Sequence, residues 1–186
     1  MTLPRAAFLD RDGVINRAVV RKGKPYPPAA VEELEILPGV ADAILRLRGA
    51  GYAVVVVTNQ PDIARGATTQ AMVDTIHAHM KAELGLDDVR VCPHDDADGC
   101  DCRKPRPGLL LRTPAYDLAA SAMIGDRWRD IEAGRAAGCG VTILVDYGYD
   151  ERIPQEPDAR VESLAEAVDW LLARDRPGAH SAVPAD

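Results

Sequence analysis

Aromatic residues are scarce in this sequence, at 4% of its 186 residues. A hydrophobic core must therefore consist of aliphatic side chains, and the hydrophobic content of 47% is sufficient for one. No apolar run is long enough to cross a bilayer, so no membrane partner is expected. The first residues lack the hydrophobic region and cleavage site of a signal peptide, which predicts a cytoplasmic protein.

Positive charge is also in short supply, since the chain carries a formal net charge of −7 at pH 7. A nucleic-acid partner is not expected, because binding to a phosphate backbone depends on clustered Lys and Arg side chains. No heptad pattern or long apolar stripe calls for a second subunit, so we expect a monomer. The length fits one domain, predicted over residues 1–175, and residues 176–186 are predicted to form a flexible tail.

Short runs of apolar residues alternate with longer amphipathic segments along the chain. Strands are expected at residues 5–9, 52–57, 88–92, 122–124 and 141–145. Helices are expected at residues 38–48, 69–84, 128–137 and 163–173, with a short or kinked one at 109–117. This alternation predicts an α/β fold, a doubly wound, Rossmann-like parallel sheet flanked by helices. Ligands in such folds bind beyond the carboxyl ends of the strands.

Polar residues follow four of the predicted strands: Asp10 with Asp12, Thr58, the loop that leads to Lys104, and Asp126. Side chains two residues apart in an extended segment point the same way, with their α-carbons about 7 Å apart. Two carboxylates at this spacing can flank a phosphoryl group, one as the nucleophile and the other as the acid and base. They can also hold a hard metal ion through their oxygen atoms.

Four segments in chain order resemble the four motifs of the haloacid dehalogenase (HAD) superfamily of phosphotransferases: Asp10–Ile15, Thr58–Gln60, Cys102–Pro105 and Ile124–Asp130. The resemblance implies that Asp10 attacks phosphorus and forms an aspartyl-phosphate. It implies that Asp12 protonates the leaving oxygen and then activates water.

The same resemblance implies a phosphate site and a catalytic metal. The phosphate would be bound by Thr58, Asn59 and Lys104. The metal would be Mg²⁺, held by Asp10, Asp12 and Asp126. Asp130, at the start of a predicted helix, is either an acceptor behind these ligands or an acid that complements the helix dipole.

A second metal site is predicted in the loop after the third strand. Three cysteines and one histidine lie within eleven residues: Cys92, His94, Cys100 and Cys102. Three thiolates and an imidazole form a closed tetrahedral Zn²⁺ site, which is typical of structural zinc. The alternative is a set of reduced buried thiols, but the Asp- and Gly-rich residues between them cannot pack a core. The loop at 92–102 runs directly into Arg103 and Lys104, so zinc would position both.

The spacing between the motifs leaves no room for an inserted cap domain. The segments Phe8–Asn16, Val57–Gln60, Ile63–Gly66 and Cys92–Gly108 closely resemble the D-glycero-D-manno-heptose-1,7-bisphosphate 7-phosphatases, small capless magnesium enzymes with a zinc loop. The resemblance implies hydrolysis of the C7 phosphate of that sugar in nucleotide-heptose and lipopolysaccharide biosynthesis. It makes Arg65 and Arg103 candidate contacts to the sugar phosphate.

Several alternatives remain open at this point. Pro61 and Asp62 stand where the family commonly has Ser-Gly, so the substrate could be histidinol phosphate or another small sugar phosphate. The basic residues Arg17, Arg21 and Lys22 are candidates to meet a second phosphate. A different class of protein, a non-catalytic zinc-stabilised binding module or a phospho-accepting receiver, shares the acidic strand ends. Asp12 argues against a receiver, because a signalling aspartyl-phosphate should persist.

Overall fold

The computed structural model describes residues 2–21, 24–152 and 156–176, and its centre is one parallel sheet of six strands. The strands are β1 (Ala6–Leu9), β4 (Ala53–Asn59), β5 (Asp88–Cys92), β6 (Ala122–Gly125), β7 (Val141–Val145) and β8 (Ala159–Val161). Their order in the sheet is β5-β4-β1-β6-β7-β8. The predicted α/β fold is therefore confirmed. Of the segment expected as a tail, residues 177–186 lie outside the described residues.

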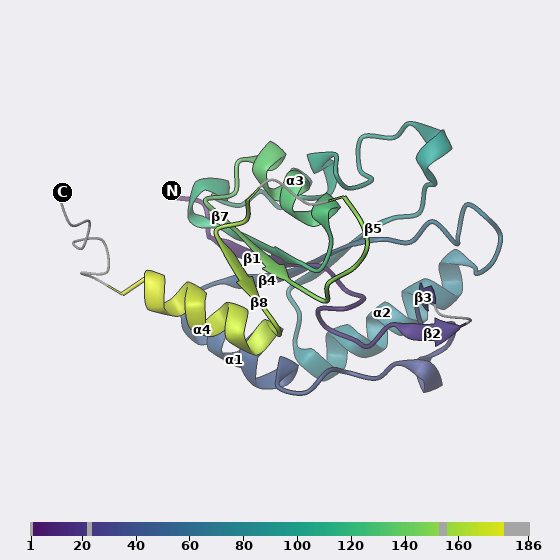
Figure 1. Cartoon of the computed structure of the whole chain (residues 1–186), viewed down its shortest axis with the longest axis horizontal. Coiled ribbons are helices and arrows are strands. Elements are labelled where there is room, and N and C mark those ends of the chain that lie inside the picture. The colour runs from purple at the N-terminus through teal and green to yellow at the C-terminus, as the bar shows by residue number, and fades with distance from the viewer. Residues whose placement is uncertain (1, 22–23, 153–155, 177–186) are drawn as a thin grey trace.

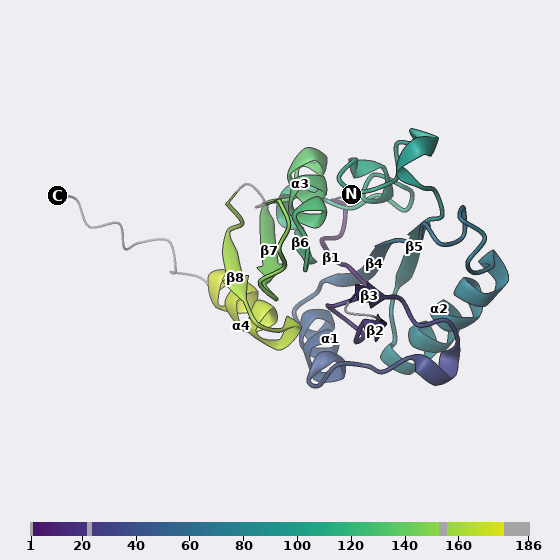
Figure 2. The same ribbon diagram turned by 45° about the vertical axis from the view of Figure 1, so that its right-hand side comes forward.

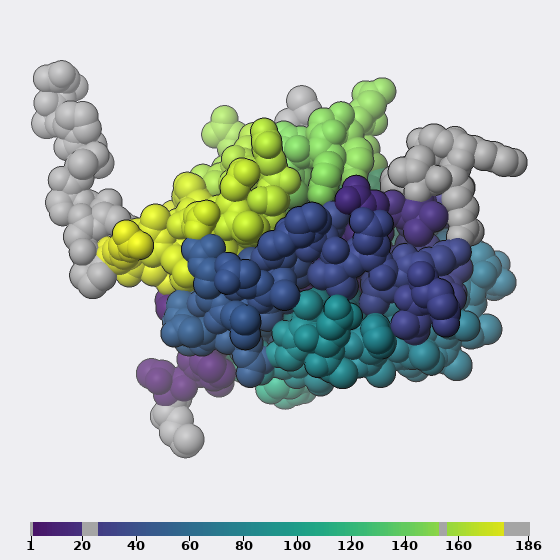
Figure 3. All heavy atoms as spheres, turned by 90° about the horizontal axis from the view of Figure 1, so that it is seen from below, coloured from purple at the N-terminus to yellow at the C-terminus, as the bar shows by residue number. Residues whose placement is uncertain are grey.

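Helices cover both faces of this sheet (Figures 1 and 2). The helices are α1 (Val40–Gly49), α2 (Gln70–Leu84), α3 (Trp128–Ala137) and α4 (Leu164–Arg174). Helices α1, α2 and α4 lie on one face, and α3 lies on the other. In the view from below, α1 and α4 lie side by side (Figure 3), where Arg46 forms an ion pair with Asp169.

The two faces follow from the alternation of side chains along buried strands. Ala7 and Leu9 of β1 pack into the cluster of α1 and α4, whereas Ala6 and Phe8 pack into the cluster of α3. All four are fully buried, as expected for a central strand in a parallel sheet. Phe8 is the only phenylalanine in the chain, so the remaining core packing is largely aliphatic.

The strand order places the carboxyl end of β1 at the point where the chain changes direction across the sheet. From β1 the chain proceeds through β4 to β5 on one side, and then returns to β6, β7 and β8 on the other. A crevice at such a switch point is the usual ligand site of an open α/β sheet. Asp10 follows β1 directly, and its backbone N–H donates to the carbonyl of Ile124 in β6 at 2.9 Å.

The helix expected at residues 109–117 is absent from the described structure, and this prediction was wrong. The segment holds only a 3-10 turn, Pro107–Leu109, followed by irregular chain. The buried guanidinium of Arg90 donates to the carbonyls of Leu109 at 3.0 Å and Pro114 at 2.7 Å, where a helix would use backbone N–H groups. Pro114 itself has no N–H to give.

A short hairpin of β2 (Val19–Arg21) and β3 (Lys24–Tyr26), not expected from the sequence, lies outside the main sheet. Helix α1 begins two residues later than expected, because Gly39 occupies its N-cap in the left-handed region at φ +79°. In the described part of the chain, every helix is too short or too polar to cross a membrane.

Candidate active site and metal sites

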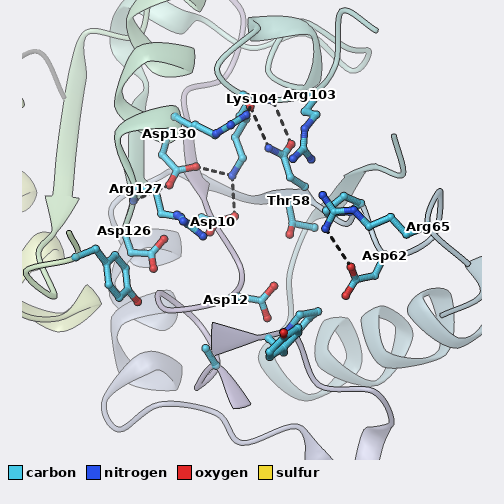
Figure 4. A pocket seen from close by; sticks show the side chains of 17 residues that line it. Asp10, Asp12, Thr58, Asp62, Arg65, Arg103, Lys104, Asp126, Arg127 and Asp130 are labelled. Atoms are coloured by element: carbon cyan, nitrogen blue, oxygen red, sulfur yellow. Dashed lines mark hydrogen bonds and ion pairs between the residues drawn. The ribbon is translucent and has the colours of Figure 1, made fainter. Parts of the chain in front are cut away.

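Three buried carboxylates and one buried ammonium meet at the carboxyl ends of β1, β4 and β6 (Figure 4). Oxygen atoms of Asp10, Asp126 and Asp130 all lie within 4.8 Å of one another. The Lys104 Nζ lies 2.7 Å from Asp10 Oδ1 and 2.6 Å from Asp130 Oδ1. It also donates to the carbonyl of Val57 at 2.7 Å. Three negative groups against one positive group leave this cluster short of two positive charges.

Burial and the neighbouring charges perturb the acidity of Asp10, Asp126 and Lys104. Burial raises the pKa of Asp10 to about 6, although Lys104 opposes the shift, and Asp130 adds to it. Burial and the neighbouring Asp10 hold the pKa of Asp126 well above its usual range. Burial alone would lower the pKa of Lys104, but its two carboxylate partners raise it above the ordinary value. The cluster is thus arranged to receive further positive charge.

The donor set fits a divalent hard cation such as magnesium. All three side chains offer oxygen, and Asp126 Oδ1 is buried without a hydrogen-bond partner among the described residues. Two glycines provide the space, since a Cβ at Gly13 would lie 2.2 Å from Asp126 Oδ2, and one at Gly125 would lie 2.1 Å from Asp130 Cβ. Gly13 also takes φ +90°, which other residues rarely adopt.

The three carboxylates that meet at this site are not the three that were expected, which were Asp10, Asp12 and Asp126. Asp130 is among those that meet, and the carboxylate of Asp12 is not. Asp12 is bound elsewhere: its oxygens accept from Arg11 at 2.9 Å, and from Asn16 and Gln60 at 3.0 Å each. The sequence spacing indicated that Asp10 and Asp12 share a side, but it could not reveal these competing partners.

Asp12 is held in its ionised form by the buried Arg11. Burial would raise the pKa of Asp12, but the Arg11 guanidinium and the three hydrogen bonds lower it below the usual value. Arg11 is fully buried, and its Nη1 lies 2.8 Å from Nε2 of His77 in α2. Since arginine can only donate, this nitrogen accepts, and His77 is neutral. Burial and Arg11 lower the pKa of His77 to about 4.

The two residues after β4's apolar run have different surroundings. Thr58 is buried, and its hydroxyl accepts from Gln60 Nε2 at 2.9 Å. Asn59 pairs with the backbone of Lys104 in both directions: Nδ2 donates to its carbonyl at 3.1 Å, and Oδ1 accepts its N–H at 3.1 Å. The side chain of Asn59, expected at the phosphate, lines the same cavity as Thr58 and also fixes the lysine segment through these two hydrogen bonds.

The four predicted zinc ligands converge on one point. The Sγ atoms of Cys92, Cys100 and Cys102 are 3.3 to 3.7 Å apart, and His94 Nδ1 lies 3.4 Å from the nearest of them. A tetrahedral Zn²⁺ with bonds of about 2.3 Å would place its sulfur ligands about 3.8 Å apart, close to this arrangement. All four cysteines of the chain, Cys139 included, are free of disulfide bonds.

A cavity of about 340 Å³ opens above the carboxylates and is lined by Asp10, Asp12, Thr58 and Lys104. Its outer wall carries Arg65 and Arg103, as expected for substrate contacts. The hairpin side adds Ala18, Tyr26 and Pro27, and the β7–β8 connection adds Tyr149. Figure 4 shows Arg65 beside Asp62, on the same side of the cavity as Arg103.

Of the basic residues expected near a second phosphate, Arg17 is described, and it does not line the cavity. Arg17 forms an exposed ion pair with Glu35 at 2.8 Å. Lys22 and the side chain of Arg21 lie outside the described residues. In contrast, Arg127 and Arg129 line the cavity, although no motif singled them out. Their position in the first turn after the Gly125-Asp126 strand end was the available signal.

Comparisons with known proteins identify the family of this chain. A family model described as HAD-hydrolase-like matches residues 101–167. The D-glycero-β-D-manno-heptose-1,7-bisphosphate 7-phosphatase of Escherichia coli K12 is 40% identical over 182 residues, which cover 90% of this chain and 87% of that protein. The protein of the same name from Rhodopseudomonas palustris is 42% identical over 148 residues, covering 72% of this chain and 79% of its own.

Solved structures give the same result. The D,D-heptose 1,7-bisphosphate phosphatase of B. bronchiseptica, complexed with magnesium and phosphate, is 34% identical with a TM-score of 0.79, covering 91% of this chain and 99% of its own. The corresponding Burkholderia thailandensis enzyme is 30% identical with a TM-score of 0.62, covering 90% and 98%. The resemblance noted in the motifs is thus confirmed. The chain belongs to the heptose-1,7-bisphosphate 7-phosphatases, a family of phosphoric monoester hydrolases among the HAD hydrolases.

Proposed function

We propose that the chain hydrolyses the C7 phosphate of D-glycero-β-D-manno-heptose 1,7-bisphosphate, as a step in nucleotide-heptose biosynthesis. The observation that carries the proposal is the meeting of Asp10, Lys104 and Asp126 in one cavity of a chain whose relatives bear that name. The β anomer is proposed because the relatives are named for it. The cavity volume of about 340 Å³ suits a small polar substrate.

The proposed reaction has two steps. A carboxylate oxygen of Asp10 attacks phosphorus, the bond from phosphorus to the C7 oxygen breaks, and Asp12 gives its proton to that oxygen. Water then attacks the aspartyl-phosphate, Asp12 takes a proton from the water, and inorganic phosphate and free Asp10 result. The doubly charged substrate phosphate favours protonation of Asp12 on arrival, because a nearby negative charge raises a carboxyl pKa.

The surrounding residues stabilise charge during both steps. Lys104, fixed between Asp10 and Asp130, offsets negative charge on the transferring group. Thr58 offers its hydroxyl at the phosphate side of the cavity. We assign Mg²⁺ to Asp10, Asp126 and Asp130, and Zn²⁺ to the four Cys and His ligands as a structural ion. When bound, magnesium neutralises charge on the phosphoryl oxygens.

We further propose that residues 1–175 act as one domain and that the protein is a cytoplasmic monomer without nucleic-acid or membrane partners. Four free cysteines, three of them in the proposed zinc site, suit a reducing compartment. The net charge of −7 disfavours a polyanionic partner. Gel filtration coupled to light scattering tests the monomer, and elution at twice the mass of 20.0 kDa would contradict it.

A substrate panel tests the proposed function. Phosphate release is measured with magnesium on the α and β heptose bisphosphates, histidinol phosphate and fructose 1,6-bisphosphate. The β heptose bisphosphate should have the highest kcat/KM, and Asp10→Asn should abolish turnover while retaining the fold. Asp74→Asn, an exposed carboxylate on α2, is the matched control and should behave as the parent. Equal activity of Asp10→Asn and the parent would refute the assigned nucleophile.

A further inference from the structure

The active-site cavity carries an arginine that none of the motifs predicted. Arg129 lies in the first turn of α3, between Trp128 and Asp130, and lines the cavity. Its Nη1 donates to Asp96 Oδ1 at 2.9 Å, and Arg103 Nε donates to the same oxygen at 2.8 Å. Asp96 belongs to the loop between the predicted zinc ligands, so one loop carboxylate holds two guanidinium groups side by side.

The arginines around the cavity are not equally neutralised. Arg65 forms a bidentate pair with Asp95, at 2.7 and 2.8 Å, and also contacts Asp62. Arg127 is paired with Glu151. Arg103 and Arg129 share Asp96 as their acidic partner among the described residues. Two positive charges against one negative charge leave a surplus positive charge at this part of the wall.

The donors of Arg129 are also incompletely used. Within the described residues, only its Nη1 makes hydrogen bonds, to Asp96 and more weakly to the carbonyl of Lys104 at 3.5 Å. The side chain is 31% exposed and packs over the ring of Trp128, with its Cζ 4.9 Å from the ring centroid. A guanidinium held by stacking and one carboxylate still presents N–H groups to an incoming anion.

We propose that Arg129 adds a second guanidinium, beside the expected contact Arg103, to the subsite for the substrate phosphate that is not hydrolysed, and that Asp96 positions the two groups. This rests on the proposed function, in which the substrate carries two phosphates. A dianion at this subsite would offset the surplus positive charge. The carbonyl of Lys104 lies 3.5 Å from Arg129 Nη1, and the Nζ of the same lysine lies 2.7 Å from Asp10 Oδ1. One residue thus joins the proposed subsite to the reacting centre, so a substrate anchored at one end can meet Asp10 with the other.

The test compares two substrates that differ only in the second phosphate, the heptose 1,7-bisphosphate and the heptose 7-phosphate. Loss of a charge-assisted hydrogen bond to a dianion corresponds to a roughly tenfold to hundredfold change in affinity. In Arg129→Gln, we expect the ratio of kcat/KM for the bisphosphate to that for the monophosphate to fall by about this factor, mainly through KM. Arg129→Lys should retain part of the ratio. Arg135→Gln, an exposed arginine on the same helix, should leave it unchanged.

The variant Asp96→Asn distinguishes a role of Asp96 in positioning the two guanidinium groups from a purely electrostatic role. The variant adds one positive charge to the wall, so a purely electrostatic role predicts a lower KM for the bisphosphate. Positioning predicts a higher KM, because the two guanidinium groups lose their shared anchor. Thermal unfolding of each variant shows whether the fold is retained. A lower KM in Asp96→Asn overturns the positioning role.

The remaining outcomes distinguish the subsite from the proposed function. If Arg129→Gln changes the two substrates equally, or changes neither, the subsite is refuted while bisphosphate hydrolysis stands. If the parent protein does not hydrolyse the bisphosphate, the proposed function fails and the subsite fails with it.

Discussion

Replacing Lys104 by methionine removes the one ammonium in the carboxylate cluster while retaining a buried chain of similar size. Asp10 and Asp130 then lose partners at 2.7 and 2.6 Å. Removing one member of a buried ion pair typically costs about 3–5 kcal/mol of stability, because the other charge stays buried and unpaired. For a domain of this size, that loss corresponds to a decrease in Tm of roughly 6 to 20 °C.

The cost in the Lys104→Met variant should depend on pH in a defined direction. Without the ammonium, the pKa of Asp10, already about 6, rises further. A carboxyl group with a raised pKa stabilises the folded state below the unfolded value and loses that contribution as pH rises through the folded value. The variant should therefore be most destabilised at pH 8 and close to the parent at pH 5. Magnesium should recover part of the difference at pH 8.

Thermal unfolding of parent and variant at both pH values, with and without magnesium, provides the measurement. Lys81→Met, an exposed lysine on α2, serves as the control for the loss of a lysine. Turnover should fall about 10²- to 10³-fold in Lys104→Met, as expected for loss of one fixed group at a developing charge. Equal destabilisation at pH 5 and pH 8 would show that unpaired carboxylates are not its cause.

Three further perturbations test other parts of the site. Gly125→Ala would place a Cβ 2.1 Å from Asp130 Cβ and so displace that carboxylate. The magnesium concentration for half-maximal activity should rise at least about tenfold. An unchanged value would show that the added methyl group does not disturb the metal site. Cys100→Ser should lower zinc content below one per chain and reduce Tm, whereas full zinc occupancy would refute the ligand set. His77, with its pKa lowered to about 4, favours the folded state above pH 6.5 and loses this contribution as pH falls toward 4. The free energy of unfolding of His77→Gln, measured in urea, should therefore fall by about 2 kcal/mol less than that of the parent when the pH is lowered from 7 to 5. The control His79→Gln should show the same pH dependence as the parent.

The sequence was sufficient for the fold and for most of the strand-end residues. Short, largely apolar segments of three to six residues identified five of the six sheet strands, because buried parallel strands leave an apolar signal along their length. The three-residue β8 carries no such signal. Asp10, Lys104 and Asp126 meet in the structure because the carboxyl ends of parallel strands share one edge of the sheet.

The features of the site and the fold that the sequence did not predict depend on contacts between side chains that are distant along the chain. Asp130 enters the carboxylate cluster because Lys104 reaches it from another loop. The Asp12 carboxylate accepts hydrogen bonds from Arg11 and Gln60 because both side chains are buried beside it. The burial of an arginine and a glutamine at these positions cannot be predicted from the residue types. Arg90 replaces an expected helix with hydrogen bonds to backbone carbonyls. Each case requires the position of a long side chain, and sequence periodicity does not encode it.

The strand order has a consequence for how the site comes together during synthesis. The pairing of β1 with β4 and of β4 with β5 involves residues 6–92, all of which are synthesised before β6. The lysine at 104 and the cysteine loop follow, and the acids at 126 and 130 come later still. The ammonium is therefore made before the last two members of the carboxylate cluster. A growing chain can bury Asp10 against Lys104 first, and the repulsion among three acids arises only when a positive partner is already present.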